Sequence, residues 1–532
     1  MAFESFADGI TLSVEIIISM KIGNIYLQQI SKEKVMTTNK ISVFSCLAAI
    51  ILTTSVTSCH SHKTMTKQEP KNMTFDIAPD GNEPGIPPKG MPPGPPPDGE
   101  RPRGMPPRES PDGKPGERPQ GIPSGEMGEH FNENSIQSIV KVKKGFKSKR
   151  NQTIIAHEKN QSAVAAYTNS TVTLESNILT ATGNSTSDES SSFQGLNAAV
   201  LGRDESVIRM KSNTIKTLGS GGNAIFAYGK SLIYSEYDVI NCTGNGGHGL
   251  MASGGGSITA SKVNITTSGK NAGAVATDRG SGTITVTDGQ IVTTGVDSPG
   301  IYSTGNITVS DSEIESTGSE VAVIEGSNSI KLFNSKLFAK VPNKWGVMIY
   351  QSFSGDAEGA DGKFEMENGS LKYTGSVGPL FFVTNSTAYI TLTNVAVNCA
   401  SGTLVNAMSS KWGKVGSNGG DVNIKTIKQL LKGNLIADNN SKITFSLKNN
   451  SDLLGAVNPD NKAKSISMSM DGTSTWTLTA DSHVSTLVAN ISDSAVANII
   501  GNGYTLFYKT SENRVLEGKT FALKNGGSLK PE

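Results

Sequence analysis

Acidic and basic side chains that could act on a substrate are scattered through the middle of this chain. Acid/base cleavage of a polysaccharide needs a pair of carboxylates, or a carboxylate and a base, held close together. The candidates stand in separate segments: Arg203, Asp204, Glu205, Lys230, Asp278, Arg279, Glu325, Asp356, Glu358 and Asp361. Asp278 and Arg279 place an acid beside a base mid-chain. This dispersion favours solvated loops over an active centre, so we expect no catalytic residues and a protein that is not an enzyme.

One acidic loop, residues 352–363, could collect oxygen ligands for calcium. Its carboxylates are Asp356, Glu358 and Asp361, and calcium prefers such ligands. The loop lacks the spacing of an EF-hand, so it is a weak calcium candidate. The six histidines show no spacing typical of a metal site. We expect no other metal and no cofactor.

A repeated pattern predicts the elements that position these side chains. Seven repeats end in a glycine: Gly183, Gly219, Gly244, Gly269, Gly295, Gly318 and Gly375. The residues eleven and four before each glycine are apolar in every repeat, and the residue nine before is apolar in all but one. A spacing of two indicates a strand, and the later apolar residue begins a second strand after a polar corner. A repeat length of about 23 to 36 residues is typical of a stacked solenoid.

A third short strand precedes this pattern in each repeat. Its runs include Ile225-Phe226-Ala227-Tyr228 and Val347-Met348-Ile349-Tyr350. Three short strands per turn predict an all-β fold, a right-handed parallel β-helix, over residues 129–472. Residues 473–532 are expected to add further turns and a cap. In that part Trp476 and Leu478 alternate with threonine, and we expect residues 473–487 to close the last turn.

Strand alternation also predicts an apolar and aromatic line on the outer face of the third strands. Its expected members are Phe226, Met251, Val275, Tyr302, Val323, Met348 and Phe381, with Tyr228 and Tyr350 on the same face. Such a line, if exposed, often marks a binding surface. Two alternatives remain open. The N-terminal flank or the longer C-terminal loops could cover the line, or the inward and outward positions could be reversed.

The N-terminal part of the sequence reads as an export signal. A basic segment from Met36 to Lys40 is followed by an apolar stretch and then by Val56-Thr57-Ser58-Cys59. This tetrad resembles a bacterial lipobox, so we expect residues 36–58 to be a lipoprotein signal peptide and Cys59 to carry the lipid. A plain signal peptide or a short membrane anchor is the alternative. Residues 1–35 are expected to reflect a misassigned start.

Between this signal and the repeats lies a segment rich in proline and glycine, residues 59–128. Its composition cannot form a core and favours extended polyproline II geometry. We expect a disordered stalk. The net charge of +1 and the mixing of Lys with Glu argue against a nucleic-acid partner.

Two further stretches carry a resemblance to a known family. The first stretch is residues 345–352, Trp-Gly-Val-Met-Ile-Tyr-Gln-Ser, with the acidic loop after them. The second is residues 474–482, Ser-Thr-Trp-Thr-Leu-Thr-Ala-Asp-Ser. They resemble bacterial surface β-helix proteins described as adhesin-like and similar to autotransporter passenger domains. The similarity covers roughly residues 155–530. It implies a surface rod that binds ligands, with no catalytic residues to carry over. Autotransporters end in a membrane β-barrel and this sequence shows none, so the lipid would provide the anchor.

These observations lead to one functional hypothesis with two alternatives. We expect a bacterial cell-surface lipoprotein, anchored in the envelope membrane, whose rod binds glycans or cell-surface proteins. A polysaccharide lyase or glycoside hydrolase of β-helix fold is the first alternative. A structural envelope protein is the second.

Overall fold

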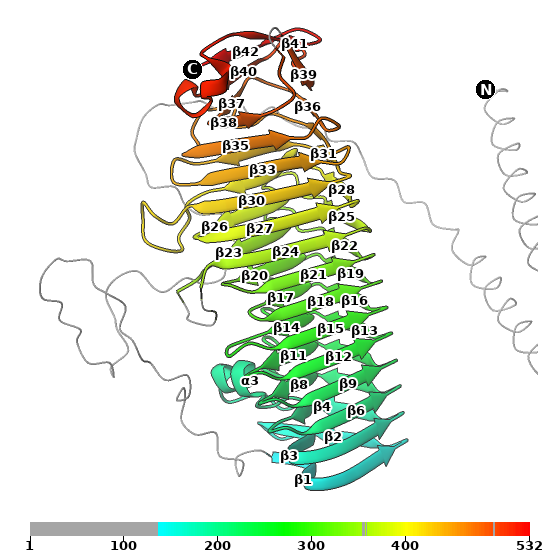
Figure 1. The fold of residues 1–532 in the computed structure, drawn as a ribbon. Helices are drawn as coiled ribbons and strands as arrows, with labels where there is room; N and C mark the ends of the chain where they lie inside the picture. Colours follow the sequence, from blue (N-terminus) through cyan, green and yellow to red (C-terminus); the bar gives the residue numbers. More distant parts are fainter. Residues whose placement is uncertain (1–136, 354–356, 358, 493–494) are drawn as a thin grey trace, which may run out of the picture. The chain divides into compact units, whose positions relative to one another are not determined.

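The computed structural model describes residues 137–353, 357, 359–492 and 495–532. These residues form a parallel β-helix, as predicted, in which successive turns stack from β1 at one end to β42 at the other (Figure 1). The predicted signal peptide, Cys59 and the stalk lie outside the described residues, as do Asp356 and Glu358. Among the helices that the structure describes, none has the length and apolar character needed to cross a membrane.

Each regular turn contains three strands that pair in parallel with the turns before and after. The long strands β1 (Gln137–Arg150) and β3 (Gln161–Glu175) each run through the first two positions of a turn. The first-position strands are β5 (Val200–Gly202), β8 (Ile225–Tyr228), β11 (Leu250–Ser253), β14 (Val275–Thr277), β17 (Ile301–Ser303), β20 (Ala322–Glu325), β23 (Val347–Tyr350), β26 (Phe381–Thr384), β29 (Thr403–Ala407) and β32 (Asn434–Ala437). The second-position strands are β6 (Val207–Lys211), β9 (Leu232–Glu236), β12 (Ser257–Ser261), β15 (Thr283–Thr287), β18 (Asn306–Ser310), β21 (Ser329–Phe333), β24 (Asp361–Glu367), β27 (Ser386–Thr393), β30 (Gly420–Ile427), β33 (Lys442–Lys448), β35 (Ser465–Met470) and β38 (Thr486–Val488).

The third-position strands form a separate parallel sheet, which a smaller sheet replaces towards the C-terminus. The first sheet contains β2 (Thr153–Ala156), β4 (Ile178–Ala181), β7 (Thr214–Thr217), β10 (Val239–Cys242), β13 (Asn264–Thr267), β16 (Gln290–Thr293), β19 (Glu313–Ser316), β22 (Lys336–Ala339), β25 (Ser370–Tyr373) and β28 (Ala396–Cys399). The smaller sheet contains β31 (Leu430–Lys432), β34 (Asp452–Leu454), β36 (Thr475–Thr477), β37 (Ser482–Val484), β39 (Ala495–Ile500), β40 (Thr505–Tyr508), β41 (Phe521–Lys524) and β42 (Ser528–Pro531). Two short 3-10 helices, η2 (Thr510–Glu512) and η3 (Arg514–Leu516), precede β41.

The interior of the rod is built from columns of side chains in strict register. One column consists of Val172, Ile208, Ile233, Ile258, Ile284, Ile307, Ile330, Phe364, Ile390, Ile424, Phe445, Met468 and Leu487. All of these residues are buried in one continuous core. The positions predicted eleven residues before the glycines therefore form one stacked column, and β-branched residues suit it because they fill a pleated surface well.

The repeated glycines stack on one another at a tight corner. A methyl group on Gly219 would collide with the carbonyl oxygen of Gly183, and the same holds for Gly244 against Gly219. Gly269, Gly295 and Gly318 continue this ladder. Gly375 does not belong to it, because its nearest neighbour is the Tyr373 ring. Close backbone approach, not a special backbone angle, explains the repeated glycines.

Polar ladders line the corner between the second and third strands. Asn334, Asn368 and Asn394 adopt positive φ, which asparagine tolerates. The Asn368 amide donates to the Asn334 side chain at 3.2 Å, and the Asn394 amide donates to Asn368 at 2.7 Å. These hydrogen bonds satisfy corner groups between successive turns and confirm the predicted polar corner.

The C-terminal end of the rod departs from the regular coil. At the C-terminal end β41 pairs antiparallel with β42, which stops the parallel stacking. The segment predicted as the cap, residues 473–487, lies one level earlier: β36 pairs in parallel with both β34 and β39. It is a further turn with Trp476 in the core, so the expected position of the cap is wrong.

Candidate functional site

The predicted line of apolar and aromatic side chains exists on the outer face of the first-position strands. Phe226 is in register with Met251, and Tyr302 follows through Ala276. Tyr302, Val323, Met348 and Phe382 then continue the line through β20, β23 and β26.

Two members were assigned to the wrong face. Val275 is in register with Leu250 and Ile301 in the interior column, and Phe381 is in register with Val347 there. In β14 and β26 the inward residue comes one position later than the expected alignment, so Ala276 and Phe382 face outward instead. A slip of one residue exchanges the two faces of a strand.

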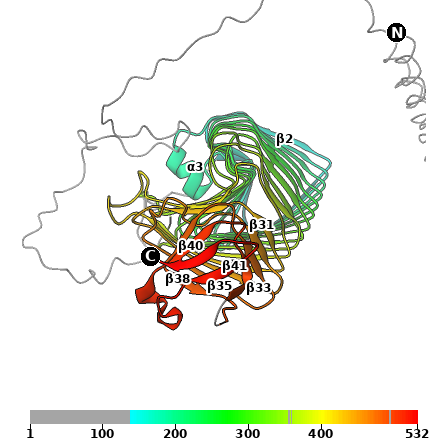
Figure 2. The ribbon, with the colours of Figure 1, turned by 90° about the horizontal axis from the view of Figure 1, so that it is seen from above.

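The N-terminal half of this outer line is covered by an inserted helix, α3 (Asp188–Gln194). Ser187 caps the helix by accepting from the Ser190 amide at 3.0 Å. The Ser253 hydroxyl donates to the Phe193 carbonyl at 2.6 Å, and Arg279 stacks over the Phe193 ring at 4.0 Å. Figure 2 shows α3 on the outside of the coil. Phe226 and Met251 are therefore buried, contrary to the expectation of an exposed stripe.

The C-terminal half is covered by Trp345 and by the loop of residues 408–418. Trp345 stacks flat on Phe382, with ring centroids 4.0 Å apart. Trp412 of the loop packs against Tyr350 at 5.4 Å. Met348 and Tyr350 are buried beneath these rings. Coverage by a C-terminal loop was one of the predicted alternatives, whereas coverage by α3, an insertion between β4 and β5, was not predicted.

Between the two covers, Tyr302 remains part-exposed above a buried carboxylate. Glu325 accepts a short hydrogen bond from the Tyr302 hydroxyl, one from Tyr350 at 2.8 Å, and another short one from Ser352. Burial raises the pKa of both tyrosines well above the ordinary value, and the nearby carboxylate adds to the effect. Both phenols therefore stay protonated and act as donors to Glu325 at neutral pH.

Beside this network lies a buried ion-pair cluster that the sequence did not indicate. The Lys344 ammonium is 2.6 Å from Asp297 and 3.7 Å from Glu320, and all three side chains are less than a tenth exposed. They border a cavity of about 60 Å³ next to Tyr302. This volume is far below the range of ordinary ligand pockets. The cluster joins three successive turns and fixes their loops.

The dispersed charged residues take part in separate local contacts. Arg203 stacks over the Tyr228 ring at 4.3 Å, and Lys230 lies 3.9 Å from Glu205. Arg279 pairs with Glu189 of the covering helix at 3.5 Å. Arg203, Tyr228 and Arg279 thus pack against one another's turns and the covering helix, which gives these side chains a structural role.

The weak calcium candidate is only partly described. Asp361 begins β24, and its backbone amide donates to the Ser327 hydroxyl at 3.1 Å. Over the ranges that the structure describes, no group of three or more His, Cys, Asp or Glu side chains is arranged to hold a metal ion.

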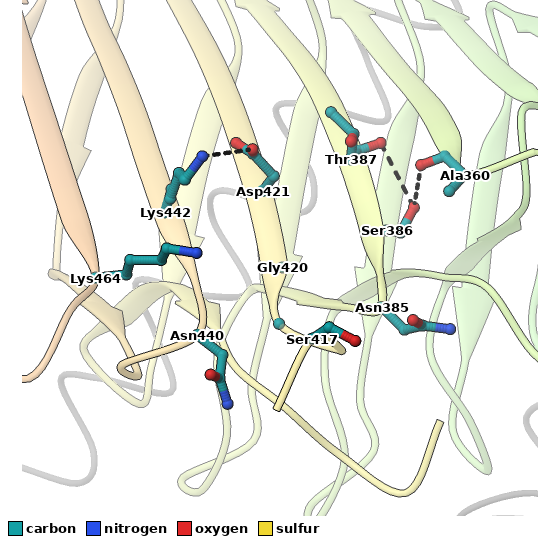
Figure 3. Close-up of a pocket in the computed structure, with 11 residues that line it drawn as sticks. Ala360, Asn385, Ser386, Thr387, Ser417, Gly420, Asp421, Asn440, Lys442 and Lys464 are labelled. Carbon is teal, nitrogen blue, oxygen red and sulfur yellow. Dashed lines mark hydrogen bonds and ion pairs between the residues drawn. The ribbon is translucent and has the colours of Figure 1, made fainter. Parts of the chain in front are cut away.

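A polar groove lies across the outer face of β27, β30 and β33 (Figure 3). Its volume is about 320 Å³, at the lower end of the range for small-ligand sites. Its lining consists of Ala360, Asn385, Ser386, Thr387, Ser417, Gly419, Gly420, Asp421, Asn440, Lys442 and Lys464.

Successive turns each supply polar groups to this groove. Thr387, Asp421 and Lys442 are in register on adjacent strands, and the Lys442 ammonium is 3.8 Å from Asp421. Lys464 of the next turn extends over the same face, as Figure 3 shows. Asn385 and Asn440 come from the loops that lead into β27 and β33, and their amides bond to Gln351 and Ser409 at 2.8 and 2.9 Å. Hydrogen bonds within the protein therefore hold Asn385 and Asn440 in place at the groove.

An exposed aromatic ring stands beside this groove. Tyr389 lies two residues beyond Thr387 on β27, so it shares the same face. It is 45% exposed and lies in register between Lys363 and Asn423. Hydroxyl, amide and ammonium groups with an adjacent flat ring can bind a polyhydroxylated ligand, because the polar groups exchange hydrogen bonds and the ring contacts an apolar sugar face.

Sequence reasoning missed this groove because its members come from separate turns and none belongs to a motif. The available signal was the polar and aromatic alternation of residues 386–393 at outward positions.

No protein-family model, curated protein or solved structure matches this chain. The resemblance to adhesin-like surface proteins therefore stays a prediction.

Proposed function

We propose that this protein is a surface-anchored carbohydrate-binding rod, and that the groove across β27, β30 and β33 is its binding site. The observation that carries the proposal is the pre-formed polar groove beside the exposed ring of Tyr389. Attachment to the bacterial envelope through a lipid on Cys59 belongs to the same proposal and is supported by the lipobox-like tetrad.

The chemistry of the groove favours a glycan over an apolar ligand. Its lining is dominated by hydroxyl, amide and charged groups, whereas pockets for drug-like molecules are mostly apolar. The regular spacing of adjacent strands, about 4.8 Å, also places successive polar groups along a line that an extended polymer can follow.

The test is a binding assay on a panel of polysaccharides, with the release of reducing and unsaturated ends measured in the same samples. The full chain carrying Cys59→Ser would be used, so that no lipid is attached. We expect saturable binding without cleavage, and a roughly three- to tenfold weaker affinity for Tyr389→Ala, because the stacking surface is lost.

Tyr234→Ala is the matched control. Tyr234 is 37% exposed at an outward position of β9, in a distant turn. Its loss should leave the affinity unchanged. Equal weakening by both substitutions would contradict the assignment of the groove. Release of polysaccharide ends would replace the binding proposal by that of a lyase or hydrolase.

A further inference from the structure

The N-terminal end of the rod carries an unusual concentration of positive charge. Strand β1 contains no acidic residue among its 14 residues. Its basic residues are Lys141, Lys143, Lys144, Lys147, Lys149 and Arg150. The chain as a whole has a net charge of +1, so this end is a local exception.

In the regular turns, lysines on the outer surface commonly face a carboxylate of the adjacent turn. Lys211 lies 3.2 Å from Glu236, Lys331 lies 3.4 Å from Glu365, and Lys340 lies 2.7 Å from Glu315. At the N-terminal end Arg150 of β1 forms such an ion pair, with Glu175 at 3.2 Å. Lys144, Lys147 and Lys149 have no carboxylate within ion-pair distance in the described ranges. Their charge is available to a partner.

Exposed apolar side chains stand among these lysines. Phe146 is 69% exposed and Ile139 is 51% exposed. Phe146 follows Lys144 and Gly145, which both adopt positive φ, at the point where the register with β3 shifts. Phe146 is in register with Thr171 at an outward position of the strand, whereas Lys147 is in register with Val172 of the interior column. The Phe146 ring therefore points away from the core at the edge of the end turn.

We infer that this end of the rod is a docking surface for an anionic lipid bilayer. Lysines attract anionic headgroups, and an exposed phenylalanine gains free energy by entering the boundary of the acyl chains. Guarding a strand edge against aggregation would account for the lysines but not for an exposed Phe146. A soluble polyanion would bind through the lysines and would leave the exposed Phe146 ring without a role.

The position of this surface in the chain fits a membrane. The segment after Cys59 enters the rod at β1, so a lipid on Cys59 would be joined to the basic end of the rod and not to its far end. The inference does not depend on that lipid or on glycan binding, because both the charges and Phe146 belong to β1.

Vesicle sedimentation tests this inference with the full chain carrying Cys59→Ser in every arm. Vesicles of phosphatidylcholine alone are compared with vesicles containing phosphatidylglycerol, at low and at physiological salt. We expect binding only to the anionic vesicles, weakened by salt. Replacing Lys144, Lys147 and Lys149 by Gln should reduce the affinity at least roughly tenfold, since each lysine near such a surface contributes several-fold. Phe146→Ser should reduce it too.

Replacement of Lys216, Lys372 and Lys432 by Gln is the matched control. These lysines are exposed on other turns, and their loss should leave the affinity unchanged. Equal effects of the two triple substitutions, or equal binding to neutral vesicles, would overturn the inference. The inference would also be overturned if the protein bound polyglutamate tightly, with an affinity that Phe146→Ser did not change, and did not bind vesicles. Thermal unfolding of each variant shows that it is folded, and Phe146→Ser tests the surface independently if the triple variant is not.

Discussion

At the scale of single residues, Asp238 shows how the interior tolerates a polar group. Its carboxylate accepts from the Asn213 amide and side chain at 2.6 and 2.9 Å, and from the Ser235 hydroxyl at 2.7 Å. Burial nevertheless raises the pKa of Asp238, because desolvation outweighs these hydrogen bonds. Asp238 therefore ends a buried ladder, in which the Asn177 side chain donates to Asn213 and the Asn213 side chain donates to Asp238, at a cost in electrostatic free energy.

Asp238→Asn should remove this cost and keep the ladder. A carboxyl whose pKa is raised in the folded state stabilises it below the unfolded pKa, and this contribution is lost as the pH rises through the folded pKa. The stability of the variant relative to wild type is therefore expected to increase from pH 4 to pH 7. Thermal unfolding across this range measures it. A stability difference between variant and wild type that does not change with pH would contradict a raised pKa for Asp238. Asp238→Ala, which removes the hydrogen-bond acceptors, should lower the stability at both pH 4 and pH 7.

At the scale of structural elements, the stacked glycine corner sets how closely successive turns approach. A side chain at Gly244 would collide with backbone atoms of Gly219 and Leu218. Backbone atoms cannot move aside as a flexible side chain could, so the turn itself must shift.

Gly244→Ala should lower the free energy of unfolding by about 1–3 kcal/mol, the usual cost of overpacking. Gly472 provides the control, because a methyl group there meets no atom within 4 Å. Gly472→Ala is expected to be nearly neutral. Denaturant unfolding of the two variants measures the difference, and equal stabilities would show that the ladder does not limit the packing of the turns.

The first strand also shows how the end of a solenoid is protected. Lys147 and Lys149 are in register with Val172 and Leu174, so they occupy interior columns at the point where the rod ends. Charged side chains at such positions disfavour stacking of a second rod on the open end.

Changing Lys147 to Val and Lys149 to Leu should therefore promote end-to-end association. Sedimentation velocity over a range of concentrations would detect it as growth of the sedimentation coefficient. Lys216→Val, at an exposed position on the side of the rod, should not associate in this way. A double variant that stays at the size of the wild type would contradict a protective role for these lysines.

The regular elements could be predicted from sequence because each turn repeats the same constraints. The column from Val172 to Ile390 and the glycine ladder from Gly183 to Gly318 follow from apolar periodicity and from the exclusion of a side chain at a fixed position. The covering segments could not be predicted in this way. The helix α3 has the sequence Asp-Glu-Ser-Ser-Ser-Phe-Gln, which reads as a polar loop, and only its docked position shows that Phe193 approaches the outer line.

The candidate site was less predictable than the fold for a related reason. Phe226, Met251 and Met348 were placed on the correct face, but their burial depends on segments from other turns. The groove near Tyr389 likewise depends on loops whose conformations are set by contacts such as the bond from Asn440 to Ser409. Such contacts leave no periodic signal.

At the scale of the whole molecule, the regular coil serves as a scaffold for a few irregular features. The stacked columns continue through the described rod, whereas α3 and the loop of residues 408–418 interrupt the regular coil (Figure 1). The groove and the basic end are departures in the side chains. Function on a repeat scaffold resides in such departures, because identical turns present the same uniform surface.

The most direct test of the binding proposal is a crystal structure of the rod soaked with the shortest oligosaccharide that competes for polysaccharide binding. Our account predicts the sugar in the groove, with a ring against Tyr389 and hydroxyls within hydrogen-bond distance of Asp421, Lys442 or Lys464. A sugar bound elsewhere, for example over the part-exposed Tyr302, would contradict this site. Cleaved product in the electron density would contradict a role in binding alone.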